Sequence, residues 1–194
     1  MLWKTLYLYM GACEMKKCLK KDILINDGDT SKKIRFDESM FLDAVKVIAT
    51  DIMKNYDLKS KKIGLIGIAR GALPLLVALS HELEIRSVSV IQVQMTNSDK
   101  KYDYGLAKIV NGYIDDCCDE YIVLEDMISH GRSVNLVVNE LIEKNKKILA
   151  IYSLFMNRDM KKLKLDNEYM DIKYVYLTRQ EQWVYFFWEK GYKI

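Results

Sequence analysis

Two adjacent carboxylates, Glu125 and Asp126, stand directly after a short apolar run in the middle of the chain. That run, 121–124, is too short for a helix and rich enough in β-branched residues to predict a strand. A short polar turn follows, and apolar residues at helical spacing then predict a helix over 134–141. This order places the N–H groups of a helix N-terminus beside two fixed negative charges. Such a site can bind a phosphate through the amides, and sugar hydroxyls or a metal ion through the carboxylates.

The turn between the carboxylates and the helix contains Ser129, His130, Gly131, Arg132 and Ser133. A glycine allows the backbone to approach a ligand closely, and small hydroxyl side chains add hydrogen-bond donors for an anion. An acid pair alone would be interpreted as two surface acids at a strand end. The turn that follows it favours a phosphate site.

A second candidate loop contains Ala69, Arg70 and Gly71, after a fully apolar strand predicted over 63–68. An arginine followed by glycine at a strand end is more often an ordinary turn, so this feature is weak alone. A helix is predicted over 73–83. Pro74 falls in its first turn, where the missing N–H has no cost.

The remaining elements alternate between strands and helices. Apolar residues at helical spacing after Asp37 predict a helix, with Asp37 or Ser39 as its N-cap; they are Phe41, Leu42, Val45, Ile48, Ile52 and Met53. Further strands are predicted over 86–94, 107–114, 148–155 and 172–177, with an exposed loop over 95–106. The alternation predicts an α/β fold with a mainly parallel central sheet flanked by helices.

Ligands of such sheets bind beyond the carboxyl ends of the strands. The segments 69–72, 125–133 and 156–158 are all predicted to lie there, so we expect one site built from all three.

Length and composition narrow the function classes. The 194 residues predict a single domain over 21–194, and residues 1–20 fit it poorly, so we expect an N-terminal extension. A net charge of +3 gives no electrostatic reason to expect nucleic acid or a membrane surface as partner. No apolar run approaches the ~20 residues of a membrane span, and no signal peptide is recognisable. Four cysteines without metal-ligand spacing predict reduced thiols in a cytoplasmic protein.

The segment 122–133 resembles the phosphoribosyl pyrophosphate (PRPP) motif of the type I phosphoribosyltransferases: four apolar residues, two acids, then a small-residue turn ending in Gly, any residue, and Thr or Ser. The resemblance implies a Rossmann-like core with a small C-terminal hood. It implies that Glu125 and Asp126 hold the ribose hydroxyls and contribute to catalysis. Mg²⁺ is the implied cofactor, bound at Asp126 and, through ribose or water, at Glu125.

The same resemblance extends to the phosphate-binding loops. It implies that the turn from Ser129 to Ser133 wraps the 5′-phosphate of PRPP. The loop 69–71 is similar to the family's pyrophosphate loop, with Arg70 meeting the pyrophosphate and a non-proline cis peptide typical there.

The C-terminal tail from 182 to 189 resembles the base-binding segment of bacterial xanthine-guanine phosphoribosyltransferases. By this resemblance Trp183 stacks on a purine, while the carbonyls of Val184 and Tyr185 accept from its exocyclic amine. Phe187 and Trp188 are expected instead to pack the tail down or to bury an oligomer interface. The implied partners are PRPP and a nucleobase, and a homo-oligomer, dimer or tetramer, is implied by analogy.

The chain departs from the 6-oxopurine branch of this family in three places. Ser129 replaces the usual aspartate near the purine N7, so His130, its neighbour, becomes a candidate proton acceptor. Asn157 stands about where a lysine contacts the 6-oxygen, and asparagine can donate or accept. Met95-Thr96 stands where a Ser-Tyr pair is common, in a loop expected to close over the site.

These departures leave three functions open. The first is a purine phosphoribosyltransferase for nucleotide salvage. The others are a phosphoribosyltransferase with a non-purine acceptor, and a non-catalytic module that senses PRPP or a nucleotide.

Overall fold

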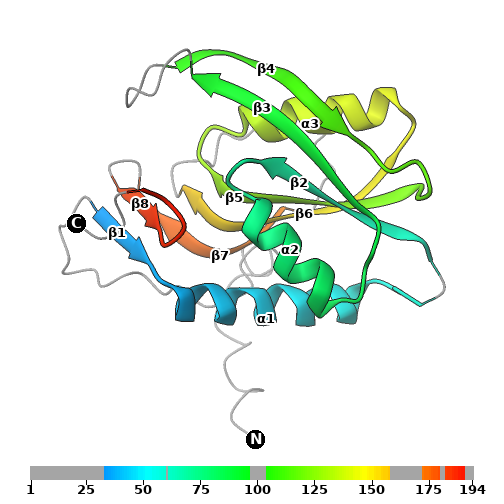
Figure 1. Cartoon of the computed structure of the whole chain (residues 1–194), viewed down its shortest axis with the longest axis horizontal. Coiled ribbons are helices and arrows are strands. Elements are labelled where there is room, and N and C mark those ends of the chain that lie inside the picture. Colours follow the sequence, from blue (N-terminus) through cyan, green and yellow to red (C-terminus); the bar gives the residue numbers. More distant parts are fainter. Residues whose placement is uncertain (1–32, 60, 97–103, 158–171, 180–181, 191–194) are drawn as a thin grey trace, which may run out of the picture.

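A computed structural model describes residues 33–59, 61–96, 104–157, 172–179 and 182–190 (Figure 1). The predicted N-terminal extension lies outside these ranges. So do residues 97–103 of the loop that was expected to close over the site.

The described residues form three helices and eight strands. In chain order they are β1 (Lys33–Phe36), α1 (Glu38–Asn55), β2 (Ile63–Ala69), α2 (Leu73–Glu82), β3 (Val88–Thr96), β4 (Tyr104–Tyr113), β5 (Glu120–Ile128), α3 (Arg132–Glu143), β6 (Lys147–Asn157), β7 (Ile172–Thr178) and β8 (Trp183–Phe186).

The central sheet has six strands in the order β4-β3-β2-β5-β6-β7. All neighbouring pairs are parallel except β3 and β4. After β2 the chain passes through α2 to β3, which lies next to β2 toward one edge of the sheet. After β5 it passes through α3 to β6, which lies next to β5 toward the opposite edge. The strand order therefore reverses between β2 and β5, and ligands bind at such a switch point. The predicted α/β fold with a mainly parallel sheet is confirmed.

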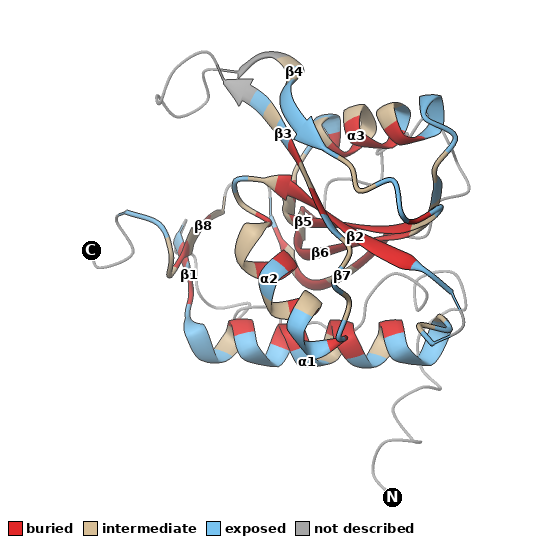
Figure 2. Ribbon diagram, turned by 45° about the vertical axis from the view of Figure 1, so that its right-hand side comes forward, coloured by how far each residue is buried: buried red, intermediate tan, exposed pale blue. Residues whose placement is uncertain are grey.

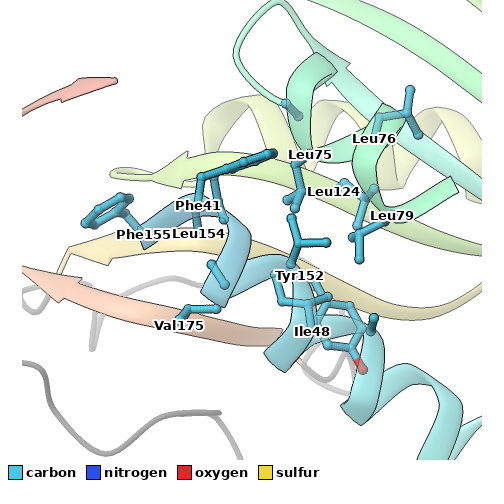
Figure 3. Packing of buried hydrophobic residues seen from close by; sticks show 14 of the residues in the cluster. Phe41, Ile48, Leu75, Leu76, Leu79, Leu124, Tyr152, Leu154, Phe155 and Val175 are labelled. Carbon is cyan, nitrogen blue, oxygen red and sulfur yellow. The ribbon is translucent and has the colours of Figure 1, made fainter. Parts of the chain in front are cut away.

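Helices cover both faces of this sheet. On one face α1 and α2 bury Phe41, Ile48, Leu75 and Leu79 against strand residues such as Leu124, Tyr152 and Leu154 (Figure 3). On the other face α3 packs Val134, Val137, Val138 and Leu141 against residues including Ile66, Val123 and Ile151. The strands β2, β5, β6 and β7 are buried along most of their length (Figure 2). Nearly continuous apolar runs such as 63–68 are what a sheet covered on both faces requires.

Helix α1 begins where the sequence predicts, because the Asp37 side chain accepts a hydrogen bond from the backbone N–H of Met40 at 2.8 Å. Its expected apolar face was wrong in two places: Leu42 is 49% exposed and Met53 is 53% exposed. Ala44 and Ala49 lie on the buried face instead. Alanine adds less to the apolar pattern of a sequence than a larger residue does, so its place on the buried face is harder to predict.

A second, two-stranded sheet pairs β1 with β8 in parallel, with Phe36 opposite Phe186. We call this pair the hood. It lies to one side of the central sheet, beside the start of α1 (Figure 1). The resemblance implied the hood, but β1 itself was not predicted. Its four residues alternate exposed and buried, and their partner strand comes near the end of the chain.

Several element boundaries differ from the sequence prediction, and the differences near the candidate site are the following. β5 does not end before the acid pair but continues through it to Ile128, with Glu125 paired to Ser153 of β6. α3 begins at Arg132 rather than 134. The predicted loop 95–106 is shorter, because β3 continues to Thr96 and β4 begins at Tyr104. Within the described ranges, every helix is too short or too polar to cross a membrane.

Candidate active site

Glu125 is a buried carboxylate, only 5% exposed, near the carboxyl end of β5. Both of its oxygens accept hydrogen bonds. Oε2 accepts from the Ser133 hydroxyl at 2.9 Å, and Oε1 accepts from the backbone N–H of Asp126 at 3.1 Å. The first of these bonds ties the strand to the first turn of α3, so the sequence-predicted pair of acid and closing hydroxyl is brought together.

Asp126 is half-buried beside Glu125, and its Oδ1 accepts from the backbone N–H of Met127 at 2.8 Å. Burial raises the pKa of Asp126 above its ordinary value. Burial, together with the charge of Asp126, raises the pKa of Glu125 well above its ordinary value. Two such carboxylates favour a ligand that brings hydroxyl donors or positive charge to them.

The turn before α3 ends at Gly131, the N-cap residue, whose φ of 67° and ψ of 7° are in the left-handed region. Only glycine adopts that conformation without steric cost. No side chain caps the helix there, so the N–H groups of its first turn face the turn without a side-chain partner. This is the geometry that binds a phosphate at a helix N-terminus.

Ser129 and His130 lie in the same turn and contact each other. The Ser129 hydroxyl and Nδ1 of His130 are 3.2 Å apart. Ser129 is half-buried, and His130 and Arg132 are exposed. A hydroxyl paired with an imidazole can hold or pass on a proton, whereas the serine alone cannot act as a base at neutral pH.

The loop after β2 lies against the acid pair. The Ala69–Arg70 peptide bond is cis, as the resemblance implies. A Cβ built at Gly71 would overlap the carboxylate of Asp126. The neighbouring strands β2 and β5 thus bring the loop 69–72 and the acid pair into direct contact at the switch point of the sheet.

Glu189 is a charged group of this site that sequence reasoning missed. It follows β8 in the hood, and its Oε2 accepts from the backbone N–H of Phe186 at 3.4 Å. Burial raises the pKa of Glu189, with a further increase from Asp126 and an opposing decrease from Arg70. The segment after β8 therefore carries a carboxylate that interacts electrostatically with both predicted site residues. Its only sequence signal was an acid at the end of an aromatic run.

The residues predicted to contact a base lie on two other elements. Asn157 is buried at the end of β6, next to Thr178 of β7 in the strand register. Trp183 and Tyr185 are half-buried on one face of β8, while Val184 is buried on the other. Their shared role as base contacts stays a prediction.

Phe187 and Trp188 were expected to pack the tail down, and this is confirmed. The Phe187 ring centroid lies 5.6 Å from that of Phe41, and Trp188 stacks on Phe186 at 4.7 Å.

The donor set at the acid pair fits a magnesium ion that is held mainly by substrate. No group of three or more metal-ligating side chains occurs among the described residues. Mg²⁺ commonly takes one or two carboxylates and completes its shell with water and substrate phosphates. Asp126, whose Oδ1 accepts a single backbone hydrogen bond, is such a carboxylate. Glu125 fits less well as a direct ligand, because both its oxygens already accept hydrogen bonds.

Solved structures similar to this chain share its fold at low sequence identity. A purine phosphoribosyltransferase from Pyrococcus horikoshii is 22% identical, with a TM-score of 0.62, 82% of this chain and 95% of that chain being covered. A xanthine-guanine-hypoxanthine phosphoribosyltransferase from Helicobacter pylori is 21% identical, with a TM-score of 0.62 and coverage of 83% and 96%. A hypothetical protein from Neisseria gonorrhoeae with bound ppGpp is 16% identical, with a TM-score of 0.64 and coverage of 82% and 90%.

At these identities the solved structures establish the fold alone. No curated protein matches the sequence. The family described as the phosphoribosyl transferase domain matches residues 36–194, which include the acid pair, both phosphate loops and the hood strand β8. The chain therefore belongs to the phosphoribosyltransferase domain family.

Proposed function

We propose that the chain transfers the 5-phosphoribosyl group of PRPP to a purine base, guanine, xanthine or hypoxanthine, and releases pyrophosphate. One observation carries the proposal: the loop 69–72, the acid pair and the uncapped N-terminus of α3 converge at one switch point. PRPP carries the three groups that such a site would bind, which are a pyrophosphate, a ribose with two hydroxyls and a 5′-phosphate. The two similar structures named as purine enzymes support a purine as acceptor.

In this proposal each loop binds one part of PRPP. The N–H groups of the first turn of α3, with Ser129, Ser133 and the intervening backbone, hold the 5′-phosphate. Asp126 and Glu125 accept hydrogen bonds from the ribose hydroxyls. Arg70 and the backbone of 69–71 hold the pyrophosphate.

A nitrogen of the base attacks C1′ as the C1′–oxygen bond to pyrophosphate breaks, and the electron pair of that bond leaves with pyrophosphate. Positive charge develops on the ribose ring, and the nearby carboxylates of Glu125 and Asp126 stabilise it. Arg70 stabilises the negative charge of the leaving group. Asp126, and Glu125 through ribose or water, would hold Mg²⁺, which would supply Lewis-acid stabilisation of that leaving group.

The base must also lose a proton. Ser129 cannot accept it unaided, so we assign the proton to His130, either directly or through the Ser129 hydroxyl 3.2 Å away. Trp183 stacks on the base, the carbonyls of Val184 and Tyr185 accept from an exocyclic amine, and Asn157 contacts the 6-position.

The test measures nucleotide formation from PRPP and Mg²⁺ with guanine, xanthine, hypoxanthine and adenine. Wild type is compared with a double variant, Glu125→Ala plus Asp126→Ala, and with His130→Asn. We expect product with at least one 6-oxopurine, none from the double variant and a large loss of turnover in His130→Asn. The absence of product with every base refutes the transferase proposal. Turnover with orotate or another pyrimidine alone would instead favour the non-purine acceptor.

A sensing function is the second candidate, and the ppGpp bound to the similar protein from Neisseria gonorrhoeae is what favours it. A guanosine polyphosphate could occupy the same base and phosphate sites as the reactants. Calorimetric titration with ppGpp and with PRPP separates the two functions. Tight binding without turnover of any base favours sensing, and the appearance of activity in Ser129→Asp would then indicate a decayed enzyme.

We further propose a single domain over 21–194, a cytoplasmic location and a homo-oligomer, dimer or tetramer. The free thiols of Cys117 and Cys118 are consistent with a reducing compartment. Light scattering coupled to size-exclusion chromatography measures the oligomeric state.

A further inference from the structure

Phe36 is the last residue of β1 and is completely buried. Five aromatic rings surround its side chain, all edge to face. They are Phe155 at 5.0 Å, Phe186 at 5.6 Å, Tyr176 at 5.7 Å, Trp188 at 6.1 Å and Phe41 at 6.4 Å between ring centroids. Edge-to-face pairs at these distances are attractive and directional, so the cluster fixes angles as well as distances.

Two of these rings come from the strands that end at the proposed base site. Phe155 precedes Asn157 by two residues on β6, and Tyr176 precedes Thr178 by two residues on β7. Residues two apart on a strand point to the same face. The rings that touch Phe36 therefore share a sheet face with the last side chains of those strands.

The rings of Phe186 and Trp188 come from the hood. They stack on each other at 4.7 Å, and both meet Phe36. The backbone N–H of Phe187 also donates to the Phe36 carbonyl at 3.1 Å. The segment that carries Trp183 and Glu189 is thus bound to Phe36 by both backbone and side chain.

Side chains must set the angle between the hood and the central sheet, because the two sheets share no strand pairing. Phe36 joins them through more ring contacts than a single pair: its ring meets Phe155 of β6, Tyr176 of β7, Phe41 of α1 and Phe186 of β8. Phe186 also meets Phe155 directly, at 5.8 Å between ring centroids, so Phe36 completes a three-ring contact between the two sheets.

We propose that Phe36 is a positioning residue for the base: through Phe186 and Phe155 it sets Trp183 on β8 against Asn157 on β6. The inference rests on the proposed function, since it requires a base between those two elements. It assigns to Phe36 no contact with the base. Loss of the ring leaves the phosphate and ribose groups on β5 and α3 in place and misaligns the base contacts alone.

The test compares two ligands that differ only by the base. Isothermal titration calorimetry measures the binding of guanosine 5′-monophosphate and of ribose 5-phosphate, and the ratio of affinities reports what the base contributes. Phe36→Leu removes the ring and keeps an apolar side chain. The control is Ile52→Ala, which replaces a completely buried residue of the same core in the C-terminal half of α1. Thermal unfolding of both variants establishes that each is folded at the titration temperature.

We expect Phe36→Leu to bind guanosine 5′-monophosphate about tenfold more weakly (about 1.4 kcal/mol), the size of one or two lost aromatic pairs. Its affinity for ribose 5-phosphate should match that of wild type. Ile52→Ala should keep both affinities.

Two results overturn the inference while the proposed function stands. In the first, Phe36→Leu keeps the wild-type ratio of affinities for the two ligands. In the second, Ile52→Ala lowers that ratio as much as Phe36→Leu does. Wild type that binds both ligands alike overturns the inference and the base half of the proposed function. Wild type that binds neither ligand overturns both proposals entirely.

Discussion

Glu125 is a buried carboxylate, and burial disfavours its charged form. Its two hydrogen bonds, from Ser133 and from the Asp126 backbone, offset part of the cost of burial. The raised pKa shows that this compensation is incomplete. The site therefore keeps a carboxylate in an environment that destabilises the charged form until a ligand supplies donors.

The pH dependence of stability follows from this pKa. A carboxylate whose folded pKa lies above its ordinary value of 4.5 contributes stability that is fully present below that value. The contribution is lost as the pH rises through the folded pKa, because the unfolded chain gives up the proton first. We expect Glu125→Gln to raise the melting temperature at pH 8 and to leave it little changed near pH 4.

Thermal unfolding between pH 4 and 8 measures this effect, and Glu140→Gln, a substitution on the outer part of α3, is the control. A variant that is less stable than wild type at pH 8 would show that the bond to Ser133 outweighs the cost of burying the charge.

Gly71 tests the contact between the two halves of the site. Its Cα lies so close to the Asp126 carboxylate that a methyl group has no room. We expect Gly71→Ala to displace that carboxylate and to weaken PRPP binding about 100-fold, which equals about 2.7 kcal/mol. Calorimetric titration with PRPP and Mg²⁺ measures it.

Gly67→Ala is the matched control, since the atoms nearest to an added methyl there belong to the Leu76 side chain, the first at 2.9 Å, and not to a residue of the acid pair. It should lower the melting temperature without changing PRPP affinity. Equal losses of affinity in the two variants would contradict a special role for Gly71.

At the residue scale, the sequence predicted the members of the site better than their environment. The acid pair, Gly131 and Ser133 form a motif whose spacing is visible in one dimension. The burial of Glu125 is not visible, because a charged residue gives no hydropathy signal for the interior. Glu189 was missed for a different reason: its neighbours in space, Asp126 and Arg70, are far from it in the chain.

At the element scale, the proposed phosphate site depends on how α3 begins. The helix begins with a glycine in a left-handed conformation and no side-chain cap. A Ser, Thr, Asp or Asn at the N-cap would ordinarily stabilise the helix by about 1 kcal/mol. The absence of such a cap leaves the first-turn N–H groups available to a ligand.

Gly131→Ala should therefore affect both stability and binding. The left-handed conformation costs a residue with a Cβ about 1–2 kcal/mol, so the melting temperature should fall. Ribose 5-phosphate should also bind more weakly, because the turn that wraps its phosphate is displaced. Differential scanning calorimetry and titration calorimetry measure the two effects.

Gly112→Ala on β4 is the control, since a Cβ there would meet no atom closer than 3.5 Å. It should change neither property. Unaltered phosphate binding in Gly131→Ala would show that the α3 turn is not the phosphate site.

The prediction of helices and strands succeeded where apolar residues recur at regular spacing, and it failed where the pattern of burial is irregular. Apolar runs such as 63–68 and the periodicity from Phe41 to Ile52 gave β2 and α1 nearly at their observed bounds. β5 was ended too early because its last residues are charged or half-buried although still paired with β6. β1 was missed because a four-residue strand gives too little pattern to distinguish from a turn.

At the scale of the whole molecule, a buried polar network joins elements far from the site. Lys173 of β7 pairs with Asp51 of α1 at 2.7 Å, and the Tyr152 hydroxyl of β6 donates to the same carboxylate oxygen at 2.6 Å. Burial and Asp51 together raise the pKa of the Tyr152 hydroxyl. Tyr152 and Lys173 each lie five residues before the end of the site-facing part of their strand, at Asn157 of β6 and Thr178 of β7. The network is therefore separated along the strands from the proposed base contacts.

Lys173→Met should reduce the free energy of unfolding by about 2–3 kcal/mol, somewhat less than for a fully buried pair because Asp51 is 22% exposed. Urea denaturation measures it. The double variant with Asp51→Asn should recover part of the loss, because it removes the unpaired charge. A change in PRPP affinity in Lys173→Met would contradict the separation between this network and the site.

The hood joins strands from opposite ends of the domain, since Phe36 and Phe186 are 150 residues apart in the chain. Closing so long a loop is entropically costly and slow compared with forming each βαβ unit. On the ribosome, β1 emerges early and has no strand partner until β8 has been synthesised. The phosphate-binding half, from β2 to α3, can assemble before that moment. In the proposed function, the base contacts on β8 are consequently the last part of the site that a newly made molecule completes, and the first that premature termination of translation removes.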